Sequence, residues 1–397
     1  MSSTNGSDAK LSSDAQFRNP DAAVEFFRKK DRSRGYDLQE VVGIRTLSWN
    51  CDGTTLACGS QNRIVAAAAL DQSCRLKLVF PGYGHEDPVD AVEFSKTNPL
   101  TLASCSGDKS VRIWDLRNKQ SHTKITTKEA NLFLTWSPDD RYVIYGDKSN
   151  NVGLLDARSF KTVQTYSFKE DCNEMVFHPN GNFLFVTTDT GKIDILSMPN
   201  LKLVKTIQAH PQLSMCQSIC ISPDGRYLVV GASDACCSIW DLKTLICVQS
   251  LIRLDYPVRT VSFSHCSKLI ASGSEDHFID IAWAETGERI AEIPISNECF
   301  DVTWHPRYYL LAYASSGSSE RERDRDSTIS LRVGFAEENL KNFSVDQLNA
   351  YDKIINGEHM EWDLYYYYTG RKPPPPDLAT NPVFQKMREF VKNKERG

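Results

Sequence analysis

The chain has 397 residues, of which 41% are hydrophobic and 24% charged, and its formal net charge is −5. This composition is typical of a folded globular protein, and the net acidity excludes a chain that is basic throughout. The longest fully apolar run, residues 64–70, is too short to cross a bilayer, and the start MSSTNGSDAK lacks the basic and apolar parts of a secretory signal. We therefore expect neither a membrane segment nor a secretory signal.

The N-terminal residues fall into three short segments. Residues 1–19 are polar and rich in serine, which predicts disorder. Residues 20–35 combine apolar side chains at helical spacing with the basic run 28–34, which predicts a short basic helix. Such a charge run is most often a solvated face and less often contacts phosphate or a partner. Residues 36–42 could supply an outer strand to the domain that follows.

From residue 44 onward, a strand followed by a tight turn recurs at a constant interval. Proline fixes φ and glycine tolerates positive φ, so both residue types close such turns. The interval between equivalent turn positions is 41 to 44 residues. These turn positions are Pro138, Pro179, Pro223, His265 and Pro306.

A second pattern, a strand ending in Trp-Asp or a variant of it, keeps the same interval. Its equivalent positions are Asp115, Asp156, Ser197, Asp241 and Trp283. Because two independent patterns share one period, we interpret the chain as tandem repeats of four short strands, the blades of a WD40 β-propeller. The sequence therefore predicts an all-β, seven-bladed propeller over residues 36–335. The seven repeats begin near Ile44, Pro88, Asn131, Cys172, Cys216, Pro257 and Cys299.

Polar residues at fixed places in the repeats predict buried hydrogen-bond networks, since buried His and Trp N–H groups need partners. The second repeat has the full set of His85, Ser104, Asp108 and Trp114. Reduced sets are His210, Asp234 and Trp240 in the fifth repeat, and Ser272 and Asp276 in the sixth. Val230 stands at the serine position of the fifth repeat, and Ala282 at the Trp position of the sixth. A Ser/His/Asp catalytic set would use the same residue types, but recurrence at the repeat interval favours a structural role.

The sequence contains no phosphate loop, HExxH, nucleophile elbow or CxxC motif. We therefore expect no catalytic residue, no cofactor and no metal. The cysteines lie mostly in strand-like runs, which predicts buried apolar positions for them. Examples are Cys105, Cys220, Cys236, Cys237 and Cys247.

The composition changes towards the C-terminus. Residues 315–327 are a charged insertion, which predicts a loop inside the last repeat. Residues 336–397 contain a helix-like segment, an aromatic segment, tetraproline and a basic amphipathic end at 386–396. We expect a partly helical extension that clamps the propeller or a partner; a flexible tail is the alternative.

Several stretches of the repeats resemble one WD40 family more narrowly. The run at 250–290, together with SGDKSVRIWDLR, GKIDILSMPNLKLVKTIQAHP, FDVTWHP and the basic FFRKKDRSR, is similar to the family of the third subunit of the THO complex. The resemblance covers residues 24–335. It implies a nuclear, non-catalytic scaffold that binds other subunits of the THO and transcription–export complexes and couples transcription elongation and mRNA processing to mRNA export. Contact with messenger ribonucleoprotein would be mainly indirect, and weak RNA contacts would come from the basic ends.

A second interpretation remains open. Trp114-Asp115-Leu116-Arg117, with Asp156-Ala157-Arg158 one repeat later, resembles the WDxR box of substrate receptors of cullin ubiquitin ligases. Trp-Asp closes most blades of this fold, however, and a following arginine is common.

We expect partner contacts on the connection at 253–259 and the turn at 274–277, where charged and aromatic residues gather. The alternative is that Asp255 and Arg259 pair locally to hold the loop. The residues expected to bind a partner are Arg253, Asp255, Tyr256, Arg259, Glu275 and His277.

Overall fold

The computed structural model describes residues 33–36, 38, 41–71, 75–118, 121–316, 327–332 and 374. The chain divides into two units, Met1–Val333 and Gly334–Gly397. All secondary structure in the described part is β-strand. The predicted disorder at 1–19, the helix at 20–32, the charged loop at 317–326 and, apart from Pro374, the extension at 336–397 lie outside the described residues.

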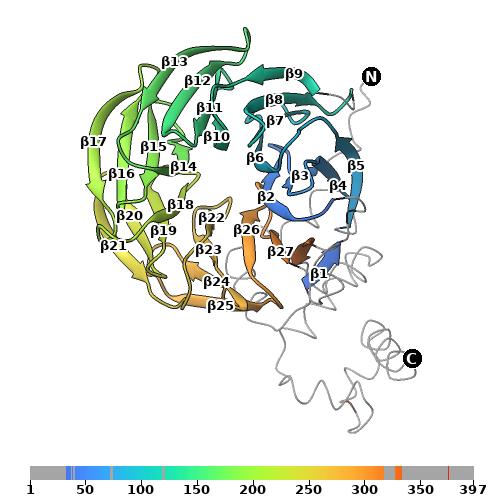
Figure 1. Cartoon of the computed structure of the whole chain (residues 1–397). Coiled ribbons are helices and arrows are strands. Elements are labelled where there is room, and N and C mark those ends of the chain that lie inside the picture. Colours follow the sequence, from blue (N-terminus) through green and yellow to red (C-terminus); the bar gives the residue numbers. More distant parts are fainter. Residues whose placement is uncertain are drawn as a thin grey trace, which may run out of the picture. The chain divides into compact units, whose positions relative to one another are not determined.

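The strands of the first unit form seven four-stranded antiparallel sheets (Figure 1). In six of them, four consecutive strands run from the inner to the outer edge. The first three of these are β2 (Ile44–Trp49), β3 (Thr55–Ser60), β4 (Val65–Leu70), β5 (Leu76–Gly82); β6 (Val89–Phe94), β7 (Thr101–Ser106), β8 (Ser110–Asp115), β9 (Ser121–Thr126); and β10 (Asn131–Trp136), β11 (Tyr142–Asp147), β12 (Asn151–Asp156), β13 (Lys161–Ser167). The next three are β14 (Cys172–Phe177), β15 (Phe183–Thr188), β16 (Lys192–Ser197), β17 (Lys202–Gln208); β18 (Cys216–Ile221), β19 (Tyr227–Ala232), β20 (Cys237–Asp241), β21 (Ile246–Leu251); and β22 (Thr260–Phe263), β23 (Leu269–Gly273), β24 (Phe278–Trp283), β25 (Arg289–Pro294).

The seventh sheet joins the two ends of the repeat region. It runs β26 (Cys299–Trp304), β27 (Leu311–Ser316), β28 (Ser327–Arg332) and β1 (Ser33–Tyr36). An N-terminal strand was expected here, but its expected position at 36–42 is wrong, as is the helix expected to continue through 33–35. The segment that pairs with β28 ends at Tyr36. Beyond it, Leu38 and Val41 are buried between the last and first sheets.

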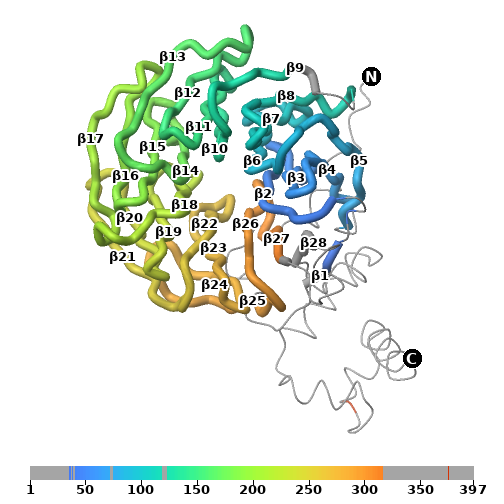
Figure 2. Tube along the Cα trace, in the orientation of Figure 1, coloured from blue at the N-terminus to red at the C-terminus, as the bar shows by residue number. Residues whose placement is uncertain are grey.

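The sheets are arranged around a ring, with their inner strands side by side (Figures 1 and 2). Each inner strand contacts the next one in sequence order, and β26 contacts β2. Seven apolar clusters of described residues each lie between two neighbouring sheets. The cores are therefore between sheets, and the middle strands are buried on both faces, as β3 and β19 are.

The outer strands are exposed, because nothing described covers their outward face. All but one residue of β13 are solvent-exposed. The expectation of buried cysteines holds only in part. Cys105 and Cys237 are buried and Cys220 and Cys236 are half-buried, but Cys247 lies on the outer strand β21 and is exposed.

Inner strands are also joined by hydrogen bonds from side chains to the neighbouring backbone. Most inner strands carry a β-bulge at their second residue. Polar side chains near the start of inner strands accept N–H groups from the next inner strand, and a buried N–H left without an acceptor would be costly. The bonds, each from a backbone N–H to a side-chain oxygen, are Val92 to Thr46 (3.4 Å), Ile219 to Glu174 (2.7 Å), Val261 to Ser218 (3.1 Å), Val302 to Thr260 (3.1 Å) and Leu47 to Asp301 (2.6 Å).

Candidate interaction face

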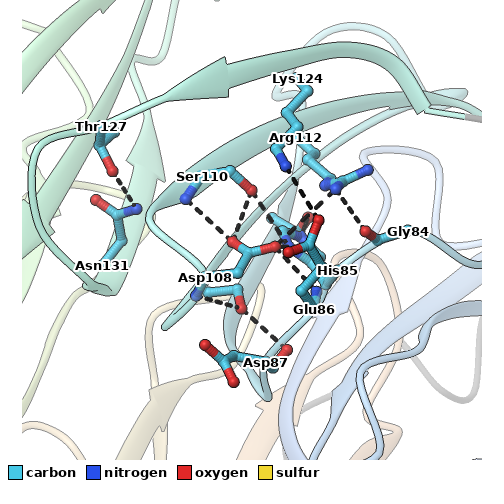
Figure 3. A network of polar contacts seen from close by, with 12 residues as sticks. Gly84, His85, Glu86, Asp87, Asp108, Ser110, Arg112, Lys124, Thr127 and Asn131 are labelled. Carbon is cyan, nitrogen blue, oxygen red and sulfur yellow. Dashed lines mark hydrogen bonds and ion pairs between the residues drawn. The ribbon is translucent and has the colours of Figure 1, made fainter.

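The second sheet contains a chain of hydrogen bonds through the four polar residues expected from its sequence. The Trp114 Nε1–H group donates to Ser104 Oγ over 2.8 Å. Ser104 Oγ lies 2.7 Å from His85 Nε2, and His85 Nδ1 lies 2.9 Å from Asp108 Oδ2. Figure 3 shows the acidic end of this chain, where Ser110 Oγ also donates to Asp108.

The pKa values set the direction of these bonds. Burial lowers the pKa of His85, so its ring is neutral at pH 7. Burial opposes ionisation of Asp108, but hydrogen bonds from His85 and Ser110 hold the pKa of this carboxyl well below its usual range. The carboxylate therefore accepts from His85 Nδ1–H, His85 Nε2 accepts from Ser104, and Ser104 accepts from Trp114. Since every donor is used, the set is a structural network with no free nucleophile.

The fifth sheet builds the same chain with a serine that the sequence pattern did not identify. Trp240 Nε1 donates to Ser238 Oγ over 2.9 Å, and Ser238 Oγ lies 2.9 Å from His210 Nε2. His210 Nδ1 lies 2.9 Å from Asp234 Oδ2. Val230, at the expected serine position on β19, is the cross-strand partner of Ser238 on β20. The hydroxyl therefore comes from β20 instead of β19, but it lies between His210 and Trp240 as the serine of the second sheet lies between His85 and Trp114.

The sixth sheet does not form this chain. Leu254, which is buried, occupies the place of the histidine in RLDYPV when the segment is aligned with GHEDPV. Asp276 instead accepts from Ser274 Oγ (2.6 Å) and from the backbone N–H groups of Asp255 (3.2 Å) and Tyr256 (3.3 Å). Ser272 is buried in β23 opposite Asp280. Asp276 thus fixes the backbone of the connection at 253–259.

Arg253 is tied into the sheet by an ion pair. Its Nε lies 3.1 Å from both carboxylate oxygens of Asp280, and its Nη1 donates to the Gly287 carbonyl over 2.8 Å. The Asp280 side chain is 1% exposed and also lies 3.3 Å from Arg289. The guanidinium of Arg253 therefore neutralises a buried carboxylate, and a contact between Arg253 and a partner stays a prediction.

The other residues expected to bind a partner differ in how free they are. Arg259 forms a local ion pair, but its partner is Glu275 and not Asp255. Asp255 and Tyr256 are exposed on a fixed backbone. His277 is exposed, and its Nδ1 lies 2.9 Å from the Ser296 carbonyl.

These residues share one face of the ring, which we call the connection face. It carries the connections from each outer strand to the next inner strand, here 209–215 and 252–259, and the turns between second and third strands, here 189–191, 233–236 and 274–277. Leu213, which the sequence analysis passed over, is 96% exposed on this face. A lone leucine in a loop gave no periodic signal by which it could be found.

No group of three or more His, Cys, Asp or Glu side chains in the described part of the chain is arranged to hold a metal ion. The same residues include no helix long and apolar enough to span a membrane.

The fold, the repeat interval and the Trp–Ser–His–Asp chains define a WD-repeat β-propeller. In agreement, the family described as WD domain, G-beta repeat matches residues 73–115, 201–241 and 247–281. The chain is 35% identical over 288 residues to THO complex subunit 3 of Arabidopsis thaliana, covering 70% of this chain and 88% of that protein. The chain belongs to the THO complex subunit 3 family of WD-repeat proteins. It is also 28% identical over 296 residues to WD repeat-containing protein AAC3 of Dictyostelium discoideum, covering 68% of this chain and 61% of that protein.

A different similarity begins where the propeller ends. Residues 331–391 match the family described as flavinator of succinate dehydrogenase. Over 60 residues the chain is 57% identical to succinate dehydrogenase assembly factor 2, mitochondrial, of Caenorhabditis elegans, covering 15% of this chain and 50% of that protein. The chain thus spans half the length of this relative. This similarity was not expected from the residue pattern, which predicted only a clamp or a flexible tail for residues 336–397.

Proposed function

We propose that the chain is a non-catalytic scaffold subunit of a THO complex in the nucleus, where it helps to couple transcription elongation and mRNA processing to mRNA export. The observation that carries this proposal is the 35% identity to THO complex subunit 3 across 88% of that relative. The polar chains described above support a non-enzymatic role, because each His, Ser and Asp in them is engaged in holding a sheet together.

We also propose that the seven sheets are seven blades of one closed ring. The contact of β26 with β2, the apolar cluster between them and the pairing of β1 with β28 support closure. A closed ring leaves only short, protected strand edges at its centre.

Affinity purification of the tagged full-length chain from nuclear extract tests the scaffold proposal. We expect the other THO subunits to be recovered in comparable amounts. Recovery of none of them would overturn the proposal, and recovery of a cullin adaptor in their place would favour the WDxR interpretation.

The structure gives the WDxR interpretation little support. Both carboxylate oxygens of Asp115 accept from the Arg117 guanidinium, which is therefore paired within its own turn. The family comparison also favours the THO assignment.

We propose a second function for residues 331–391, in the assembly of succinate dehydrogenase. The 57% identity over 60 residues to an assembly factor of that enzyme favours it. In cells that lack their own assembly factor, expression of the full chain should restore succinate dehydrogenase activity, and a chain ending at Val333 should not. Equal activity with both chains would contradict this function and leave the THO proposal untouched.

A further inference from the structure

Two exposed apolar side chains, Leu213 and Tyr256, lie on neighbouring connections of the connection face. Leu213 is 96% exposed and Tyr256 is 51% exposed, and Met215, on the same connection as Leu213, is 41% exposed. We call these three residues the apolar patch. Exposed large side chains of this kind cost solvation free energy in the free protein and are typical of protein interfaces.

Hydrogen bonds show that the two connections flank the same turn. On one side of the turn at 233–236, Met215 and Ser233 exchange two bonds, Met215 N–H to Ser233 Oγ and Ser233 N–H to the Met215 carbonyl, each of 2.9 Å. On its other side, Val258 N–H donates to the Ala232 carbonyl over 3.0 Å. Figure 1 shows the corresponding sheets, β18–β21 and β22–β25, side by side.

The backbone beneath the patch is held in place. Ser214 N–H donates to the Pro211 carbonyl over 2.8 Å, which closes the turn that presents Leu213. The buried Asp276 accepts the N–H groups of Asp255 and Tyr256. A partner therefore meets apolar side chains on an ordered backbone and does not have to order it on binding.

The free charge around the patch is negative. Arg253 and Arg259 are paired with Asp280 and Glu275, and the connection at 209–215 contains no lysine or arginine. An exposed carboxylate remains at Asp255, and Asp234, which also accepts from His210, lies on the turn between the two connections. Asp234 keeps 24% of its side chain exposed.

From this combination we infer that the apolar patch docks a protein segment in which apolar side chains are flanked by lysine or arginine. Carboxylates beside the patch would pair with the basic residues and fix the register of the segment. RNA does not fit, because its phosphates would meet the carboxylates of Asp234 and Asp255. A second copy of the chain does not fit either, because the carboxylates of the two copies would face and repel one another. The inference rests on the proposed scaffold function and names the kind of partner that the scaffold binds.

A photo-crosslinking amino acid placed at position 213 or 256 of the full-length chain tests the inference in nuclear extract. We expect crosslinks to a segment of another THO subunit, and we expect that segment to contain apolar residues beside lysine or arginine. The matched control is position 204, since Val204 is 57% exposed but lies on the outer strand β17. Crosslinks from 213 or 256 to RNA, to a second copy, to this chain's own ends or to an acidic segment would overturn the inference, and so would their absence.

Substitutions provide a second measurement. Leu213→Ser with Tyr256→Ser should lower the recovery of THO subunits at least roughly ten-fold, as loss of interface anchors does, and Asp255→Lys should lower it in the same direction. Val204→Ser should leave recovery unchanged. If the wild-type chain recovers THO subunits and the double variant recovers as much, the patch is not the docking site, although the scaffold function stands. If the wild-type chain recovers none, the scaffold proposal itself has failed.

Discussion

The carboxylate of Asp301 accepts a hydrogen bond of 2.6 Å from the backbone N–H of Leu47, and this bond joins the last inner strand to the first. The same carboxylate accepts from Thr260 Oγ1 over 2.9 Å, so it links three inner strands. Nearby, a Cβ at Gly53 would lie 2.3 Å from the ring of His305, which shows how closely the last sheet packs on the first. Burial raises the pKa of Asp301 to about 6.

Asp301→Ala should therefore destabilise the ring at its closure. The substitution leaves the Leu47 N–H and the Thr260 hydroxyl without their acceptor, and a buried unsatisfied group costs about 1–3 kcal/mol. Urea unfolding of the full-length chain measures the change, with Asp255→Ala, an exposed carboxylate, as the control. Equal midpoints for the two variants would show that Asp301 does not hold the closure.

Glu174→Gln should change how stability depends on pH. Burial raises the pKa of Glu174 from an ordinary 4.5 to about 7, so the folded protein favours the neutral carboxyl. The stabilising contribution of the bound proton is complete below pH 4.5 and is lost as the pH rises through 7. Glutamine keeps the acceptor for Ile219 N–H without a charge.

We therefore expect the variant to gain stability relative to wild type as the pH rises from 5 to 8, by up to about 3 kcal/mol. Thermal unfolding of both proteins across this range gives the difference. If the unfolding temperatures of variant and wild type differ by the same amount at every pH, the titrating group is not Glu174.

Asp108→Ala should unfold the second sheet more easily. It removes the acceptor of His85 Nδ1–H and of the Ser110 hydroxyl, and we expect a loss of about 1–3 kcal/mol. Ser238→Ala should have an effect of similar size in the fifth sheet, since it leaves Trp240 Nε1 and His210 without their shared hydroxyl. Glu86→Ala is the control for chemical denaturation, because the Glu86 side chain is 77% exposed. A variant of Asp108 that keeps full stability but loses partner binding would indicate a binding role for this residue.

Arg253→Ala should lower the free energy of unfolding more than Arg259→Ala does, because only Arg253 pairs with a buried carboxylate. Without Arg253, the buried Asp280 retains only Arg289, and we expect a loss of about 1–3 kcal/mol after allowing for the partial exposure of the pair. Without Arg259, an exposed ion pair is lost, which costs less than about 1 kcal/mol. Differential scanning calorimetry compares the two; equal stability would mean that Arg253 is available to a partner after all.

RNA binding by the full-length chain should be weak, independent of sequence and abolished by salt. The propeller is acidic, whereas the segments 28–34 and 386–396 are basic and would release counterions from phosphate. Substitution of their lysines and arginines by glutamine should remove binding in an anisotropy titration over a salt series. Substitution at 28–32 is preferable to deletion, because β1 begins at Ser33 and completes the last sheet. Salt-resistant binding by the substituted chain would show that the propeller itself contacts RNA.

The sequence by itself determined the repeat interval and the start of each inner strand to within a few residues, as at Ile44, Asn131 and Cys216. It also determined the family and the residue types of the network at His85. These features are readable because a blade is a local unit whose turns and strand ends recur along the chain.

Only the tertiary structure decided which side chain completes each network and which charges remain free. Ser238 replaces the missing hydroxyl from a neighbouring strand, and Arg253 is engaged by Asp280, 27 residues further on. Asp301 meets Leu47 across 254 residues, and the connections that carry Leu213 and Tyr256 flank one shared turn. Each of these relations depends on how sheets pack around the ring, and packing between distant segments has no period in the sequence.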